Sequence, residues 1–595
     1  MIYGKTKKRI AVIPILLIIA LIAGSCSGSS ANGNSSSPSP ATQTSAAATT
    51  SSDKAASQGK TGAGDAIVLT AMLEAMTDEG IVETDLDKAL KDTTGVVIDR
   101  INCTIEKLAL VSSSGDLPDI IHFFSSPDVA KNMTASGALQ PLDSLLDQYG
   151  QNLRTNIPTA LKWSKEIFGG GTTYIIPTRT WIAELDRPNR NGWYGGYYTR
   201  WDVYKAIGAP EMKNEDDYLD VLKKMMEYQP TNKDGKKVYG LTLWTDWGLW
   251  PFNQTYGRTY GYEILQSLSA MLNRETKEVQ SQFLDPNGIF WQAMKFYNKA
   301  WIKGVLDPEG FVIKTDQVAD KIKTGEVLAT PANWWAPSKE LLGEDAINVM
   351  LPGAFPVFAD VFPSETLLGL QASHSLGISA KSAHADKAMQ VIDWLNSQEG
   401  QRAERTGIKG VDWDVVNGRP QLMGKRLDDF LKGTVDEEFN KKRGLSVYYA
   451  MDVGSARMTD GYPPFIGDAV EYMKMSATPA EIDFATHYAG ADAKLPGQAY
   501  AAMVKNGTVK TYPYDDVMPF SLGDPLPEEV TRVINQADQY IQANLSTIIM
   551  SATDAEFQAN KEKTIAAVKA MGMDTAWEAI LKNIEVSKQR ASIFK

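Results

Sequence analysis

The sequence predicts an α/β protein in which a largely parallel sheet is flanked by helices. Two observations support this prediction: short apolar runs alternate with amphipathic helical patterns from Ile67 onward, and long helical patterns occupy the C-terminal region. The chain has 595 residues, enough for one large two-lobed unit or for two to three domains. The hydrophobic fraction of 43% is ordinary for a folded protein and excludes global disorder.

The first predicted elements follow one another as strand, helix, strand and strand. Ile67–Leu73 is typical of a strand. Asp85–Thr94 fits a short amphipathic helix that ends at Gly95, and Val96–Ile98 is the second strand. Ser114–Ile121 is a turn that leads into a third strand. This alternation indicates βαβ units.

Four further segments carry helical patterns. The clearest begins after Asp285-Pro286, where apolar residues recur at three- and four-residue spacing until Gly304 stops the helix. The other three patterns cover Asp386–Ser397, Glu528–Leu545 and Asp554–Ser587. No repeat with the period of a solenoid is present in the sequence.

The N-terminus has the pattern of a secretory signal. A basic cluster precedes the unbroken apolar run Ile10–Ala23, which as a helix reaches only about 21 Å and is too short for a bilayer core. Small residues and then Cys26 follow, which resembles a bacterial lipobox. We therefore expect residues 1–25 to be a lipoprotein signal peptide and Cys26 to carry the lipid. An ordinary signal peptide and an uncleaved anchor helix are the alternatives.

Residues 26–64 are almost entirely Ser, Ala, Thr, Gly, Pro and Asn. A stretch without long apolar side chains has nothing to bury, so we expect a flexible tether between the anchor and the folded part.

Composition excludes several classes of protein. The net charge of −12 argues against a nucleic-acid partner, because phosphate binding needs a basic face. Two cysteines exclude a disulfide framework, and Cys103 is expected to be a small buried apolar residue.

The sequence shows no specific signature of catalysis or of metal binding. His122, His374, His384 and His487 are scattered without the close spacing of metal ligands, and each is expected to be structural or exposed. Neither a nucleophile elbow nor a dinucleotide-binding glycine motif is present in the sequence. We therefore predict neither a catalytic residue nor a metal or cofactor. A carboxylate pair for glycoside hydrolysis stays open, with Glu184 and Asp186 as candidates.

Aromatic residues concentrate outside the helical patterns. Indoles and phenols stack on the apolar faces of sugar rings, while neighbouring polar groups bond the hydroxyls. We predict a substrate-binding set whose stacking surfaces are led by Trp193, Tyr197, Trp244, Trp247, Trp334 and Trp335. Arg179 and Arg258 are the expected polar anchors. The remaining candidates are Trp181, Tyr194, Trp250 and Trp413. Core or interlobe packing is the alternative role for each ring.

Several motifs in order along the chain resemble one known family. They are Ser114–Asp119, Gly137–Leu142, Thr173–Pro177, Arg200–Gly208, Tyr297–Pro308, Thr324–Ala329 with Trp334, and Gly407–Trp413. The chain is similar to the extracellular solute-binding proteins of ABC importers, family 1, in the large lipoprotein branch of Paenibacillus-type Gram-positive bacteria.

The resemblance implies a two-lobed periplasmic-binding-protein-like fold of type 2, with a hinge of crossing segments and a solute held between the lobes. It implies that residues 65–183 and 371–445 form one lobe, and that 184–370 and 446–595 form the other. It also implies a monomeric receptor on the outer face of the membrane, which delivers a carbohydrate of oligosaccharide size to permease subunits.

Some relatives carry a calcium loop like an EF-hand. The corresponding segment here is Pro230–Val238, which keeps Asn232, Asp234 and Gly235. Its first and ninth positions are Pro and Val, which offer no side-chain oxygen, so a plain turn is expected.

Two other functions stay open at this point. A surface-anchored glycoside hydrolase or lyase would share the secretion signal and the aromatic residues but needs a pair of acid and base groups. A lipoprotein adhesin or sensor partner would recognise an insoluble surface.

Overall fold

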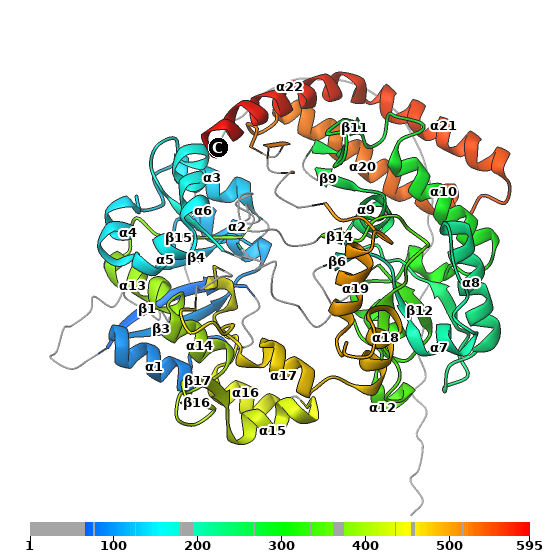
Figure 1. Ribbon diagram of the computed structural model, residues 1–595. Helices are drawn as coiled ribbons and strands as arrows, with labels where there is room; N and C mark the ends of the chain where they lie inside the picture. The colour runs from blue at the N-terminus through cyan, green and yellow to red at the C-terminus, as the bar shows by residue number, and fades with distance from the viewer. Residues whose placement is uncertain are drawn as a thin grey trace, which may run out of the picture. The chain divides into compact units, whose positions relative to one another are not determined.

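The protein is described by a computed structural model (Figure 1). The described residues are 66–74, 78–124, 126–178, 180, 194–265, 268–331, 335–360, 374–434, 436–453, 458–512, 517, 519–520 and 522–594. The expected signal peptide, Cys26 and the tether lie outside them.

The first lobe is built on a six-stranded mixed sheet of order β2-β3-β1-β4-β15-β5. Its strands are β1 (Ile67–Leu73), β2 (Gly80–Ile81), β3 (Val96–Asn102), β4 (Ile120–His122), β5 (Ile175–Pro177) and β15 (Ser375–Ile378). β1 runs parallel to β3 and to β4, as the βαβ pattern predicts. β15 returns from a distant part of the chain and pairs antiparallel with β4 and β5. A local pattern cannot reveal that direction, since it depends on where the chain re-enters the lobe.

Helix α1 (Asp85–Thr94) has the bounds that the sequence predicts. Thr84 and Asp87 form a capping box at its start, and the backbone of Gly95 is left-handed with φ of 74° at its end. Leu86 and Leu90 are buried against the sheet. Capping and one apolar face together therefore fix this helix.

The other helices of the first lobe cover the sheet and close its core. They are α2 (Ile105–Ser114), α3 (Pro127–Ala135), α4 (Asp143–Tyr149), α5 (Gln151–Asn156), α6 (Pro158–Trp163), α13 (Ala385–Leu395) and α14 (Gln398–Arg405). α13 contacts α1, α4 and α5, so the returning segment packs against the first one. Cys103 is buried in this core, as expected.

The second lobe has its own core and a four-stranded sheet of order β13-β7-β12-β8. Its strands are β7 (Tyr198–Arg200), β8 (Tyr239–Leu241), β12 (Val327–Thr330) and β13 (Asn348–Met350). A meander of β9 (Tyr262–Leu265), β10 (Ala270–Asn273) and β11 (Val279–Ser281) and a ribbon of β6 (Tyr194–Gly195) with β14 (Ala359–Asp360) complete it. β12 pairs parallel with β8 and antiparallel with β7.

Helices make up most of the second lobe. They are α7 (Trp201–Ala206), α8 (Glu215–Tyr228), α9 (Trp250–Thr259), α10 (Ile289–Ile302), α11 (Thr315–Lys323), α12 (Lys339–Leu342), α18 (Pro479–Ala489), α19 (Pro496–Lys505), α20 (Glu528–Ile549), α21 (Asp554–Ala570) and α22 (Met573–Ala591). α10 packs against α9 and α20, which confirms the predicted helices after Pro286 and Glu528.

The single helical pattern expected over Asp554–Ser587 is two helices in the structure. The break falls at Gly572, whose φ of 97° is left-handed and open chiefly to glycine. The apolar spacing continues across the break, so periodicity alone does not detect it. Ile580 and Ile584 of α22 belong to the second core, whereas Ala591 near its end belongs to the first.

The chain after α14 forms a small, separate hydrophobic cluster. It contains β16 (Trp413–Val416), β17 (Arg419–Leu422), α15 (Gly424–Lys432) and α17 (Val470–Met475), while α16 (Glu437–Arg443) contacts α1. Across the residues that the structure describes, no helix has the length and apolarity needed to cross a membrane.

Candidate functional site

Four indole rings of the second lobe form one contiguous group, here called the indole cluster: Trp244, Trp247, Trp250 and Trp335. Trp244 lies at the centre, with ring centroids 5.0 Å from Trp335 and 5.7 Å from Trp247, both edge-on. Edge-to-face pairs at such separations are the favoured aromatic geometry. The sequence predicted each of these rings separately but not their contact.

The indole cluster is unevenly exposed. Trp244 is completely buried with Ile313, Val318 and Val327, so its ring supports the cluster and offers no surface in this structure. Trp247 keeps 43% of its surface exposed. Trp250 and Trp335 are half-buried against the same apolar group.

Trp335 also lines a cavity of about 500 Å³. Strand β13 and the start of α18 contribute one part of the wall, and the end of α15 contributes another. The lining mixes apolar surface from Trp335 and Phe430 with polar groups of Asn348, Lys432 and Glu481. Both the volume and the mixture are typical of a small-molecule site. Phe430 and Lys432 were not predicted, since nothing in the pattern of α15 distinguishes them from ordinary surface residues.

Two predicted binding residues, Tyr197 and Arg258, form hydrogen bonds with other residues of the second lobe. Tyr197 is 4% exposed, its hydroxyl lies 2.8 Å from that of Tyr297, and its ring stacks on Phe355. Burial raises the pKa of Tyr197 well above its usual value. Arg258 donates two hydrogen bonds to the buried carboxylate of Glu263, at 2.8 and 2.9 Å.

Trp413 lies in the small cluster around β16 rather than with the other indoles. Its Nε1 donates to the carbonyl of Gly407 at 3.0 Å, and the guanidinium of Arg402 lies 5.1 Å from its ring centre. The structure therefore brings together four of the predicted aromatic residues and leaves Tyr197 and Trp413 elsewhere.

Several predicted residues lie outside the described part of the chain: Arg179, Trp181, Trp193 and Trp334, with Glu184 and Asp186. For Tyr194, only the backbone position in β6 is described.

The segment 230–238 folds as a turn. The side-chain oxygen of Asn232 accepts hydrogen bonds from the backbone N–H groups of Asp234 and Lys236, both at 3.0 Å. The Lys236 ammonium lies 2.7 Å from the carboxylate of Glu326.

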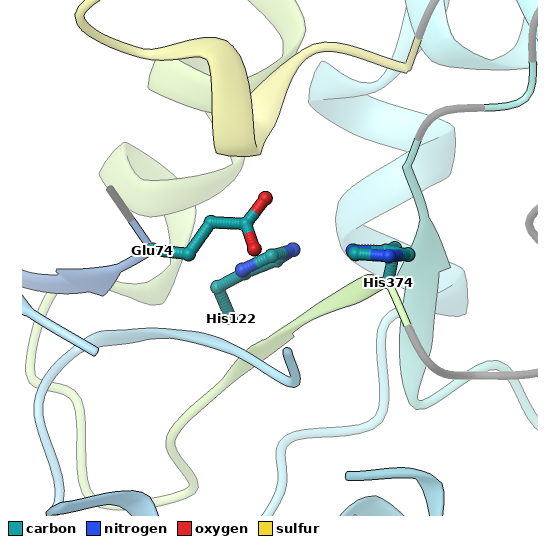
Figure 2. A group of neighbouring side chains, drawn as sticks. All are labelled: Glu74, His122 and His374. Atoms are coloured by element: carbon teal, nitrogen blue, oxygen red, sulfur yellow. The ribbon is translucent and has the colours of Figure 1, made fainter. Parts of the chain in front are cut away.

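Three polar residues that the sequence treated as unrelated meet at one edge of the first sheet: Glu74, His122 and His374 (Figure 2). Their possible ligand atoms all lie within 4.8 Å of one another. Burial, followed by the charge that His374 can carry, lowers the pKa of His122 to about 3, so this ring is neutral at pH 7. No local spacing predicted this group, because each member comes from a different strand end.

Comparison with known proteins identifies the family. The sequence model of the family described as "bacterial extracellular solute-binding protein" matches residues 94–402, which is just over half of the chain. The chain belongs to this family. The predicted family and its α/β fold of two lobes are thus confirmed.

This solute-binding protein also has a curated relative in Streptococcus pneumoniae, the fructooligosaccharide ABC transporter substrate-binding protein FusA. The two are 31% identical over 239 residues, which is 37% of this chain and 41% of the relative's length.

Solved structures with the same fold cover more of the solute-binding protein but are distant in sequence. FusA from S. pneumoniae in complex with kestose has a TM-score of 0.55 at 15% identity and covers 88% of this chain and 100% of its own. An HMO-binding solute-binding protein from Bifidobacterium longum infantis has a TM-score of 0.56 at 14% identity, covering 88% and 99%. The alginate-binding protein AlgQ2 without calcium has a TM-score of 0.54 at 15% identity, covering 88% and 98%.

Proposed function

We propose that this protein is the lipid-anchored receptor of an ABC importer and that its solute is a carbohydrate of oligosaccharide size. Membership of the extracellular solute-binding family supports the receptor role. The names of its relatives, which mention a fructooligosaccharide, kestose and alginate, support the carbohydrate.

The single observation that carries the choice of a carbohydrate is the position of Trp335. This ring belongs to the indole cluster and at the same time lines the cavity, so packing holds it in place and solvent reaches part of it. A fixed aromatic surface stacks on the apolar face of a sugar with little loss of side-chain entropy. Asn348 and Glu481 on one part of the cavity wall and Lys432 on the other offer donors and acceptors for hydroxyl groups.

Capture of the solute and its release to permease subunits require the two lobes to move relative to each other, about the chain segments that cross between them. In this proposal the chain crosses near the expected boundaries at residues 183 and 370, and again beyond the expected boundary at 445, since Tyr448 and Val453 still pack in the first core. Hinge motion at these crossings closes the lobes on the solute. The receptor acts as a monomer outside the cell and binds its solute without altering it. Release of reducing ends from a polysaccharide by the purified protein would replace the receptor by a hydrolase or lyase.

The anchor is proposed from the lipobox-like sequence around Cys26. Replacing Cys26 with Ser removes the thiol that would be acylated, so the variant should leave the membrane fraction and appear in the medium. Wild-type protein that is released to the same extent would contradict the anchor and leave the receptor role standing.

Calorimetry of the purified full chain against a panel of soluble oligosaccharides tests the solute class. We expect one sugar class to bind, and Trp335→Ala to weaken that binding by about tenfold, which corresponds to about 1.4 kcal/mol of stacking. Trp577→Ala is the matched control, because Trp577 is a half-buried indole on α22 that does not line the cavity. Failure of every glycan to bind, together with tight binding of a peptide, would overturn the carbohydrate.

A further inference from the structure

The group formed by Glu74, His122 and His374 lies at one edge of the first sheet because of strand direction. β1 runs parallel to β4, with Met72 opposite Ile121, so Glu74 and His122 leave the sheet at the same carboxyl edge. β15 runs antiparallel to β4, with Leu376 opposite His122, so its amino end brings His374 to that edge. In α/β sheets this is the edge outside which ligands bind.

His122 carries the strongest sign that something is missing from this group. Its side chain is completely buried, and neither Nδ1 nor Nε2 has a hydrogen-bond partner among the described residues. A buried polar group without a partner costs about 1–3 kcal/mol, so native proteins rarely keep one without a bound water or ion. The ring of His374 lies 5.8 Å from that of His122, roughly stacked at 28°, and the carboxylate of Glu74 approaches the same space (Figure 2).

We propose that Glu74, His122 and His374 form a binding site for a divalent transition-metal ion of the zinc class. Two imidazoles and one carboxylate suit Zn²⁺ and its neighbours, whereas Ca²⁺ and Mg²⁺ prefer sites made of oxygen alone. The ion converts one unpartnered nitrogen of His122 into a ligand and offsets the charge of the Glu74 carboxylate.

The geometry needs only a small adjustment. Ligand atoms on a tetrahedral zinc ion lie about 3.4 Å apart, given bonds of about 2.1 Å. The three candidate ligand atoms are already within 4.8 Å of one another. Binding of the ion therefore requires the Glu74 and His374 side chains to rotate toward it. His374 is half-buried, which gives an ion access from solvent.

Three protein ligands leave a fourth position open. Structural zinc sites usually have four protein ligands, whereas sites with three bind water or a donor atom of another molecule in the fourth position. The proposed ion therefore adds a Lewis-acidic contact point at the ligand-binding edge of the first lobe. This inference does not depend on the identity of the solute.

Metal binding is tested on full-length protein without a histidine tag, after treatment with a chelator. We expect one Co²⁺ per chain with visible absorption of tetrahedral intensity, and competition by Zn²⁺ but not by Ca²⁺. His374→Ala should weaken binding by more than the roughly 10–100-fold that loss of an outer-sphere partner costs, since it removes a ligand itself. Glu74→Gln should also weaken binding.

The chain contains four histidines, so the two that lie outside the proposed site serve as controls. His384→Ala and His487→Ala should leave the Co²⁺ spectrum unchanged. His122→Ala changes a fully buried position, so its folding is checked by circular dichroism, and His374→Ala is the deciding variant. Absence of Co²⁺ and Zn²⁺ binding, or binding that His374→Ala leaves intact, would overturn the site whatever the outcome of the sugar titrations.

Discussion

The two lobes differ in the hydrogen bonding of the titratable side chains that they bury. The first lobe encloses polar groups without partners, among them His122 and the carboxylate of Glu404, for which no hydrogen bond of ordinary geometry exists within the described residues. In the second lobe the buried carboxylates of Glu263 and Asp307 each meet a cation, and aromatic rings pack edge to face. Buried neutral polar atoms without a hydrogen-bond partner among the described residues occur in the second lobe as well, for example Trp244 Nε1 and the Asn253 amide. The difference therefore concerns titratable side chains: His122 and Glu404 of the first lobe have no such partner, whereas Glu263 and Asp307 of the second each pair with a cation.

The largest expected effect is the loss of Trp244 from the centre of the indole cluster. Trp244→Ala removes a ring with no exposed surface and should lower the free energy of unfolding by about 3–5 kcal/mol. Trp247→Ala, at a ring that is 43% exposed, should cost less than about 1 kcal/mol. Chemical denaturation of both variants measures the difference. Equal losses would mean that the cluster acts as one unit and would remove the distinction between supporting and exposed rings.

The pair of Arg258 and Glu263 tests whether the second lobe tolerates an unpaired buried charge. The Glu263 carboxylate is almost fully buried and accepts from Arg258 and from Gln254. Arg258→Met should destabilise the protein by about 3 kcal/mol, and adding Glu263→Gln should recover part of the loss. A double-mutant cycle gives the coupling between the two residues. If Arg258 is instead a ligand anchor, the single variant will lose sugar affinity and keep its stability.

Glu404 gives the first lobe a distinct pH dependence. Burial, reinforced by Asp452 and opposed by Arg405, raises the pKa of Glu404 from 4.5 to about 8. Because the folded state holds the proton more tightly than the unfolded state, this contribution is fully present below pH 4.5. It falls by up to about 1.4 kcal/mol per pH unit as the pH rises from 4.5 to 8.

Glu404→Gln keeps the shape of the side chain without its charge. The variant should therefore be more stable than wild type at pH 8, and its stability should fall less between pH 5 and pH 8. Denaturation curves at several pH values measure both quantities. A wild-type slope that the variant reproduces would show that other groups, and not Glu404, control the pH dependence.

Local sequence patterns predicted the elements that depend on neighbouring residues. Helix α1 has its expected bounds because its caps and its apolar face lie within a dozen residues of one another. The direction of β15 and the separation of α21 from α22 were not predicted. The first depends on the path of the chain between lobes, and the second depends on the backbone of Gly572 alone.

The candidate sites likewise combine features that local sequence predicts with features that depend on tertiary structure. Residue type identified Trp244, Trp247, Trp250 and Trp335, since indoles outside helical patterns are unusual. Their exposure depends on which ring the others cover, and that is a tertiary property. The meeting of Glu74 with two distant histidines depends on sheet order, which no spacing rule contains.

The smallest expected effect concerns calcium and contrasts the two lobes once more. In the turn 230–238 the side-chain oxygen of Asn232 is already held by two backbone N–H groups, and the Lys236 ammonium pairs with Glu326. Because internal hydrogen bonds already use the Asn232 oxygen, and because Pro230 and Val238 offer no side-chain oxygen, Ca²⁺ at millimolar concentration should leave Tm unchanged. Thermal unfolding with and without Ca²⁺ measures this, and Zn²⁺ in the same assay should raise Tm through the first lobe. A rise in Tm with Ca²⁺ that Asp234→Asn abolishes would instead place a calcium site in the second lobe, and the expectation of a plain turn at 230–238 would fail.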